Sequence, residues 1–339
     1  MLGKLKLAAL GAVAGVMMVG GASAAEYQWT FQGSESAGEP QFVLKQEWAE
    51  SVFKMTNGRV KITFMPAGAV VPYSETLEAV GANIIQGQST ATSYFAGKDP
   101  AFAMFGDMVG AWGDPLELVE WLKYGGGEEL FQELMHSYNV HNIGGLATGV
   151  EAFPSRKPIR SVEDLKGLKV RAPEGMVYNV FAVAGAAPVN LPGSDVYTGL
   201  EKNVIDAADY TVLATNQDMG FHAFAKYPSY PGFHSAPLLD LSINKGIWDA
   251  LPEDIKEVLE VSADQLAYKM VYTLKQRDIK AVEIIEQDET IELVNMPAEE
   301  RAKFRKIAQE EWQVWAKKSE MCAKIVESVS EFLERRNLM

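Results

Sequence analysis

The sequence contains little cysteine, little histidine and few basic residues for its size. Its single cysteine among 339 residues, Cys322, excludes intrachain disulfides, thiolate zinc sites and CxxC redox chemistry. Lysine and arginine together number 31 against 45 aspartates and glutamates, and this net charge of −14 argues against an extended nucleic-acid interface or an anionic lipid surface. Hydrophobic residues make up 47% of the chain, which is enough for the cores of about two domains.

The common catalytic motifs are also missing. The sequence has no GxSxG, HExxH, GxxxxGK[ST] or GxGxxG pattern. No lysine follows the glycine run 125–127, so this run is interpreted as a helix break. His136 and His141 lack the i, i+4 spacing of a helical metal pair, and the other two histidines lie far from them along the chain. The residues alone therefore indicate no catalytic machinery.

The amino terminus is typical of a secretory signal peptide. Lys4 and Lys6 precede an apolar run, 7–19, and Ala22-Ser23-Ala24 then supplies the small residues of a cleavage site. The run is shorter than the about 20 residues that a membrane span needs. We predict a signal peptide at 1–24 and, for an acidic chain without disulfides, export to the bacterial periplasm.

Strand-type and helical segments alternate along the remaining chain, which predicts an α/β fold. The order strand, helix, strand over 27–65 indicates a βαβ unit. No linker separates two independent domains, so two lobes would be interleaved. Further strands are predicted at 90–95, 140–146, 168–171, 187–191, 207–212 and 238–243, and further helices at 75–85, 115–138 with a break at 125–127, 176–184, 196–202, 248–286 and 297–336.

Four motifs at close spacing carry a family resemblance: Leu165–Arg171, Ala187–Gly193, Tyr197–Glu201 and Ile205–Ala207. With them the chain resembles the extracytoplasmic solute-binding proteins of tripartite ATP-independent periplasmic (TRAP) transporters. The stretches 94–98, 121–127 and 225–234 resemble the branch that binds 2-oxo acids or lactate with a metal ion. This resemblance implies a receptor, not an enzyme, that captures a small carboxylate between two lobes and delivers it to membrane permease subunits.

The resemblance also implies a domain plan. Residues 25–148 plus about 238–260 would form lobe I, and 149–237 would form lobe II, with hinge strands between them. Residues 261–339 would provide a long helix bridging both lobes and a C-terminal helix. The ligand would lie in the interlobe cleft.

Arg171 is the expected anchor of the ligand carboxylate, because a guanidinium presents a planar fork of donors that matches two carboxylate oxygens. Without the motif, an arginine that caps a helix end or pairs with a surface acid is the favoured interpretation of this residue. Asp209 and Tyr210 lie where the branch holds a cation and the ligand, and Glu151 lies near the position of a third oxygen. Such oxygen donors suit Na⁺ or Ca²⁺. Glu151 as a solvated surface residue remains an alternative.

Aromatic residues are expected to line the cleft, as is usual for small-molecule sites, although each could equally be a core residue. The candidate walls are Tyr94, Phe153, Tyr210, Phe233 and His234. The loop 32–39 departs from the metal-dependent branch because it carries Glu35 and Glu39. If these acids face the cleft, a zwitterionic ligand becomes an alternative. The residues are also compatible with a secreted enzyme that uses Glu151 and Asp209 as an acid–base pair, or with a ligand-sensing partner of a membrane receptor.

A stripe of side chains near the C-terminus recurs at helical spacing: 315, 318, 322, 325, 329 and 332, interrupted by Lys318. It is too short to predict a coiled coil. A helix with this stripe packs on its own lobe or reaches over a second subunit, and the second arrangement would give a homodimer. Cys322 would be a core or interface residue and not a nucleophile.

Overall fold

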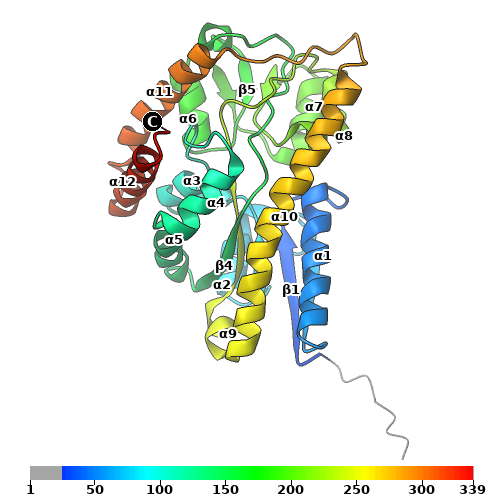
Figure 1. The fold of residues 1–339 in the computed structure, drawn as a ribbon, viewed down its shortest axis with the longest axis vertical. Helices are drawn as coiled ribbons and strands as arrows, with labels where there is room; N and C mark the ends of the chain where they lie inside the picture. The colour runs from blue at the N-terminus through cyan, green and yellow to red at the C-terminus, as the bar shows by residue number, and fades with distance from the viewer. Residues whose placement is uncertain (1–24, 339) are drawn as a thin grey trace, which may run out of the picture.

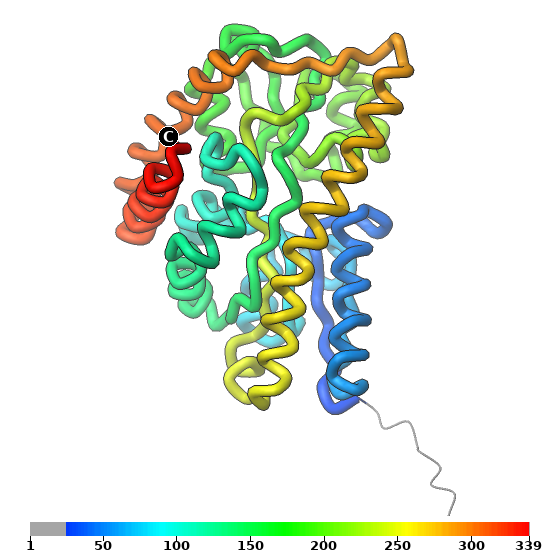
Figure 2. The backbone as a smooth tube through the Cα atoms, viewed as in Figure 1, coloured from blue at the N-terminus to red at the C-terminus, as the bar shows by residue number. Residues whose placement is uncertain are grey.

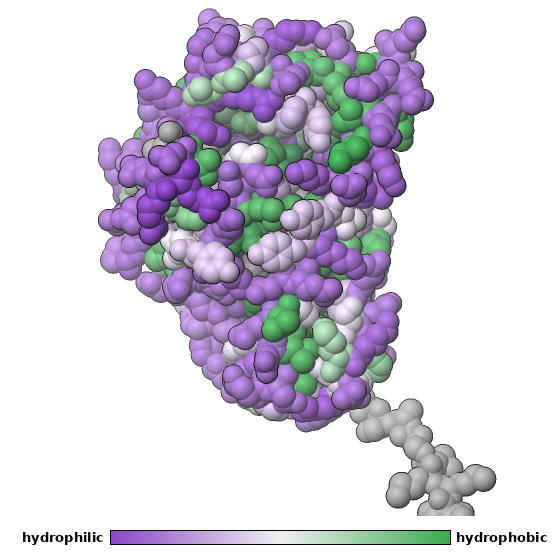
Figure 3. Space-filling model, in the orientation of Figure 1, coloured by the Kyte–Doolittle hydropathy of each residue, from purple (hydrophilic) through white to green (hydrophobic). Residues whose placement is uncertain are grey.

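The computed structural model describes residues 25–338, so the predicted signal peptide, 1–24, lies outside the described residues. Within that range, no helix combines the length and the apolar character needed to cross a membrane. The face shown in Figure 3 is mostly hydrophilic, with apolar residues scattered among polar ones. Two lobes, each built on its own sheet, are joined by segments that cross between them (Figure 1).

The sheet of lobe I has five strands in the order β2-β1-β3-β8-β4. Strand β1 runs parallel to β2 and β3, whereas β8 is antiparallel to β3 and β4. Parallel neighbours need a crossover, and α1 supplies it between β1 and β2, which confirms the predicted βαβ unit. The bounds are β1 Tyr27–Gly33, α1 Pro40–Met55, β2 Val60–Met65, β3 Gly87–Ser89, β4 Val140–Ala147 and β8 Leu238–Asn244.

Helix α1 packs one face on this sheet. Pro40 occupies its first position, where the missing backbone N–H costs no hydrogen bond. Phe42, Trp48 and Val52 are buried at helical spacing, and the indole of Trp48 donates to Ser262 Oγ at 2.9 Å. That bond ties α1 to the long helix α10 (Glu253–Ile285).

Lobe II is built on three short parallel strands in the order β6-β5-β7. They are β5 (Lys169–Arg171), β6 (Ala187–Val189) and β7 (Ala207–Ala208), and α6 (Met176–Val183) and α7 (Val196–Glu201) follow the first two. The predicted strand 207–212 is thus only two residues long, because the chain leaves the sheet after Ala208 to form part of the interlobe region.

The chain leaves the sheet of lobe I after β4 and re-enters it at β8. All three strands of the second sheet lie between these points, and on this basis we propose lobe boundaries near 148 and 238. Helix α10, of 33 residues, contacts α1 and β4 of lobe I and α8 (Leu213–Asp218) of lobe II. Its path along both lobes is visible in Figure 2.

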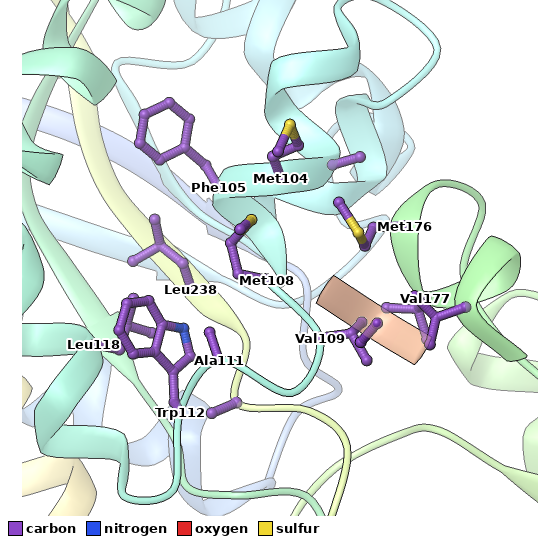
Figure 4. Close-up of a cluster of buried hydrophobic side chains, with 14 of the residues drawn as sticks. Met104, Phe105, Met108, Val109, Ala111, Trp112, Leu118, Met176, Val177 and Leu238 are labelled. Atoms are coloured by element: carbon purple, nitrogen blue, oxygen red, sulfur yellow. The ribbon is translucent and has the colours of Figure 1, made fainter. Parts of the chain in front are cut away.

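The two C-terminal helices also join the lobes. Helix α11 (Ala298–Trp315) contacts α6, while α12 (Glu320–Arg335) contacts α3 (Pro100–Gly106) and α5 (Gly127–His136). In the same core, Met176 and Val177 of α6 lie beside Val109 and the end of α3, so apolar packing is continuous from one lobe to the other (Figure 4).

The predicted C-terminal stripe lies on two helices. Residues 316–319 interrupt the helix, and the hydroxyl of Ser319 caps α12 by accepting from the Cys322 backbone N–H at 3.1 Å. Cys322, Ile325 and Val329 are completely buried within their own subunit. The stripe therefore packs on its own lobe, which was one of the two arrangements expected from the sequence.

Two other predicted elements need correction. Residues 90–95 do not form a strand: the backbone N–H of Thr90 donates to Asp240 Oδ1 at 2.7 Å, and the chain then turns into a 3-10 helix, η2 (Thr92–Phe95), against α3. The predicted helix 248–286 is two helices, because Pro252 holds Leu251 in an extended conformation. The remaining elements are η1 Tyr73–Glu75, α2 Thr76–Gly81, α4 Pro115–Tyr124, η3 Val162–Leu165, η4 Gly193–Asp195, η5 Phe221–Ala223 and α9 Lys245–Ala250.

Candidate functional site

A cleft of about 490 Å³ lies between the two lobes. Its walls come from the loop after β1 and the start of α1, from the end of β5, and from the crossing segments near 148 and 235. The polar residues that line it include Glu35, Glu39, Gln41, Tyr73, Tyr94, Asp107, Glu151, Arg171, Asp209, Tyr210, Thr211 and Ser235.

Arg171 is the last residue of β5 and is almost fully buried. Its Nε donates to the backbone oxygen of Leu191 at 3.0 Å, and its Nη1 donates to the backbone oxygen of Asp209 at 2.6 Å. Two backbone carbonyls therefore fix the plane of the guanidinium. Gly193 lies close to Nη2, where an added Cβ would be 3.9 Å away. The geometry holds a positive charge rigidly at the wall of the cleft.

Asp209 lies immediately after β7, next to Arg171. The carboxylate Oδ2 is 3.7 Å from Arg171 Nη1, and Oδ1 lies 3.0 Å from Nε2 of His234. Glu151 completes the group, with Oε2 at 3.8 Å from the same imidazole nitrogen. Glu151, Asp209 and His234 are all buried, and each offers a ligand atom within 4.8 Å of the others.

The charges in this group are unequal. Burial, together with repulsion from Asp209, raises the pKa of Glu151 well above its ordinary value. Burial also opposes ionisation of Asp209, but the hydrogen bond and charge of His234 and the charge of Arg171 hold the pKa of Asp209 below its ordinary value. Asp209 is therefore the more acidic of the two carboxyl groups, and Glu151 is the one that binds a proton more readily.

The group has the oxygen ligands that a hard cation needs. Glu151 Oε2 is buried and has no hydrogen-bond partner, and it lies beside the Asp209 carboxylate. Carboxylate oxygens suit Na⁺ or Ca²⁺, whereas an imidazole nitrogen suits transition metals. His234 is already hydrogen-bonded to Asp209, so it orients that carboxylate. The two acids fit a hard cation whose remaining ligands would come from backbone and solute oxygens.

Comparison with known proteins decides the family. Residues 31–319 match DctP, the bacterial extracellular solute-binding protein family 7. The chain belongs to this family. It is a periplasmic solute-binding protein of the TRAP type, as the motifs in 165–207 suggested.

Three relatives illustrate the similarity. A TRAP solute-binding protein from Rhodobacter sphaeroides, in an apo open structure, is 47% identical with a TM-score of 0.79, covering 92% of this chain and 99% of that one. One from Pseudoalteromonas atlantica, with bound sodium and pyruvate, is 30% identical with a TM-score of 0.82, covering 92% and 95%. The monocarboxylate 2-oxoacid-binding periplasmic protein of a Nostoc species is 34% identical over 223 residues, which span 65% of this chain and 61% of that relative.

Two of the five predicted aromatic walls of this solute-binding protein line the cleft. Tyr94 packs on Tyr73 with ring centroids 4.6 Å apart, and the ring of Tyr210 lies 6.0 Å from the Arg171 guanidinium carbon. Burial raises the pKa of both phenols, so both stay protonated and able to donate a hydrogen bond. Tyr210 was also predicted as a cation ligand, and its position beside Arg171 and Asp209 is compatible with a contribution from its backbone.

The other three candidates lie one layer behind the cleft. Phe153 is fully buried between Phe181, Phe233 and His234, and Phe233 also packs edge-on against Phe304. Their predicted place as walls is therefore corrected: both are core residues, since the crossing segments pack against α6 and α11 here. His234 likewise reaches the site through Asp209 and does not line the cleft.

Glu35 and Glu39 both line the cleft, which answers the question that the sequence left open. Glu35 Oε1 is 2.5 Å from the ammonium of Lys45, a completely buried residue of α1. Glu39 accepts a hydrogen bond from the Ser36 backbone N–H at 2.8 Å, and burial raises its pKa. Because Lys45 neutralises Glu35, the cleft is less acidic than its composition suggested.

Sequence reasoning missed Asp107, which lines the cleft at the end of α3. Its carboxyl accepts a hydrogen bond from Ser235, and Oδ1 is buried without a partner. Burial, with the nearby charge of Asp209, raises the pKa of Asp107 well above its ordinary value. No local signal marks this residue, because only the crossing segment at 235 brings it to the site.

Proposed function

We propose that this TRAP solute-binding protein captures a small 2-oxo or 2-hydroxy carboxylate together with Na⁺ or Ca²⁺ and delivers it to the membrane permease of its transporter. The observation that carries the proposal is the pairing of a rigid buried guanidinium, Arg171, with two adjacent carboxyl groups, Glu151 and Asp209. The names of the Nostoc and Pseudoalteromonas relatives, which refer to 2-oxo acids and to sodium with pyruvate, support the same ligand class.

Each group has a distinct part in binding. Arg171 would hold the ligand carboxylate through its remaining donors, because its other donors are held by Leu191 and Asp209. Glu151 and Asp209 would hold the cation, which would supply positive charge for the ligand's oxygens next to Arg171. Tyr94 and Tyr210 would exclude water around the ligand.

A thermal-shift screen tests this function on the mature protein. Pyruvate and lactate are each added with Na⁺, with Ca²⁺ or after EDTA treatment in a buffer free of sodium. Binding at 100 times the dissociation constant stabilises the folded protein by about 2.7 kcal/mol, which gives a clear rise in Tm. A rise that needs both carboxylate and cation supports the proposal. No rise with any organic acid would contradict it.

The absence of catalysis is part of the proposal. Glu151 and Asp209 could act as an acid–base pair, but their carboxyl groups lie within 4.8 Å of one another, and His234 and Arg171 lower the pKa of Asp209. A cation between them would occupy both groups. Proton NMR of a bound ligand over several hours should show no product, whereas any turnover would favour an enzyme.

The homodimer through the C-terminal helix stays a prediction. The apolar face of α12 is buried against other helices of the same subunit, so a dimer formed by this helix would have to use its polar face. Light scattering after size exclusion gives the mass in solution and decides between monomer and dimer.

A further inference from the structure

A buried ion pair forms part of the cleft wall on lobe I. Lys45 is completely buried, and its ammonium contacts Glu35 Oε1 at 2.5 Å and the backbone oxygen of Ser89 at 3.2 Å. Burying two charges is costly, and the cost is recovered only when their remaining hydrogen-bonding positions are filled. The hydrogen bonding of the second Glu35 oxygen, Oε2, therefore matters for the stability of the pair.

That second oxygen, Glu35 Oε2, is buried and has no hydrogen-bond partner, although Glu35 lines the cleft. The carboxylate turns back over Gly33, where an added Cβ would lie only 2.7 Å from Oε2. Glycine at 33 thus leaves the space that the carboxylate occupies. A buried acceptor without a partner is destabilising, and more so when it is charged, so its position at a ligand cleft indicates a donor supplied by the ligand.

A second acceptor lies on the same wall. Gln41, in the first turn of α1, is 3% exposed and lines the cleft. Its Nε2 donates to Thr211 Oγ1 at 3.1 Å, and its Oε1 is buried without a partner. The lobe I wall therefore presents acceptors, while Arg171 on lobe II presents donors.

The chemistry of the wall selects the kind of donor. Lys45 neutralises Glu35, so the pair attracts a cation only weakly at short range, yet its free oxygen remains a strong acceptor. A neutral hydroxyl fits this wall better than an ammonium. The cleft of about 490 Å³ also has room for a ligand that is longer than a three-carbon acid.

We infer that Glu35 Oε2 and Gln41 Oε1 form a second ligand subsite, which accepts hydrogen bonds from a hydroxyl at the end of the ligand opposite Arg171. This inference rests on the proposed function and narrows its substrate class. The preferred solute is a carboxylate with a distal hydroxyl, and unsubstituted short monocarboxylates bind more weakly.

Isothermal titration calorimetry with matched ligands tests the subsite. The pairs are lactate with glycerate, and 2-oxobutyrate with 4-hydroxy-2-oxobutyrate, all in the presence of the cation that the screen identifies. Each pair differs by one hydroxyl. We expect at least one hydroxylated member to bind tenfold or more tightly than its partner. Equal affinities within both pairs would overturn the inference.

A double variant locates the effect. Glu35→Leu with Lys45→Met removes both charges, so no unpaired ion is left buried. Proteins often tolerate the replacement of a complete buried ion pair by apolar residues. We expect the tenfold preference to fall below threefold. The matched control is Glu47→Leu with Lys269→Met, which makes the same change at an exposed pair 2.7 Å apart outside the cleft, and it should keep the preference.

A single variant tests the subsite if circular dichroism shows that the double variant does not fold. Gln41→Leu removes the second acceptor and should reduce the preference at least threefold. A preference that persists in every folded variant would overturn the inference. If no carboxylate binds the unaltered protein, the proposed function itself fails, and this result is distinct from binding without a hydroxyl preference.

Discussion

Asp209 and Arg171 hold one another through both backbone and side chain. The Asp209 backbone N–H donates to the Arg171 backbone oxygen at 2.9 Å, and Arg171 Nη1 donates to the Asp209 backbone oxygen at 2.6 Å. The first bond extends the parallel pairing of β5 and β7. Strand pairing thus positions the cleft's guanidinium beside Asp209, one of the cation-binding candidates, although the two residues lie 38 positions apart in sequence.

Arg171→Ala should abolish high-affinity binding of the carboxylate. The substitution removes charge-assisted hydrogen bonds worth about 1.5–3 kcal/mol each, so the dissociation constant should rise about 100-fold or more. Titration calorimetry measures the change. Arg160→Ala, which removes an exposed arginine paired with Glu292, is the control and should leave affinity unchanged. Unaltered binding by Arg171→Ala would show that the anchor lies elsewhere.

Stability of the ligand-free protein should fall as the pH rises above the ordinary pKa of glutamate. Burial and the Asp209 charge raise the folded-state pKa of Glu151, so the folded protein holds a proton that the unfolded chain has released. The stabilisation is complete at low pH and is lost as the pH rises through the folded-state value. Thermal melts of unaltered protein and Glu151→Gln across pH 4–9 test this, since the variant should show a shallower decline. Parallel curves would contradict it.

The same substitution should weaken cation binding and remove its pH dependence. An amide oxygen can still coordinate Ca²⁺ or Na⁺, but it carries no charge and releases no proton, so Glu151→Gln should show a smaller Tm rise with cation and ligand, and one that does not change with pH. For the unaltered protein, cation affinity should increase with pH, because binding releases the Glu151 proton. The control is Glu163→Gln, at an exposed position in η3 outside the cleft. A cation response that stays as large and as pH-dependent in Glu151→Gln as in the unaltered protein would exclude the Glu151 carboxylate as a ligand.

Gly232→Ala should displace the backbone of Glu151 and thereby weaken cation binding. An added Cβ would lie 1.9 Å from the backbone oxygen of Glu151, so the backbone that carries this carboxyl must shift. We expect a Tm several degrees lower and a cation affinity reduced at least tenfold. Gly97→Ala provides the comparison, because an added Cβ there meets no atom within 4 Å. Equal behaviour of the two variants would argue that the Glu151 backbone is free to adjust.

The thiol of Cys322 should not react with Ellman's reagent in the folded protein. The residue is completely buried on the inner face of α12, and burial raises the pKa of its thiol, which disfavours the reactive thiolate. One equivalent should react only after unfolding in guanidinium. Rapid reaction of the native protein would mean that α12 separates from lobe I in solution.

Local sequence patterns were enough to predict the alternation of elements, and the family motif drew attention to Arg171, which lines the cleft. Helical spacing in 41–55 and strand patterns on both sides of it are local properties, so the βαβ unit could be predicted, and the motif around Arg171 carried the family. Prediction failed where long-range contacts override the local pattern. The predicted strand 90–95 is a 3-10 helix from Thr92, because the Thr90 backbone N–H is bound by the Asp240 side chain. Phe153 and Phe233, predicted as cleft walls, pack against one another in the core.

The chemistry of the cleft, by contrast, depends on tertiary contacts. Lys45 is ordinary in sequence, yet its burial against Glu35 neutralises one of the two acids that made a zwitterionic ligand an alternative. Asp107 has no local signal, and His234 acts through Asp209 instead of forming a wall. The physical reason is the same in each case. The charge and hydrogen-bonding state of a buried group depend on neighbours that the crossing segments bring together, and spacing along the chain does not encode those neighbours.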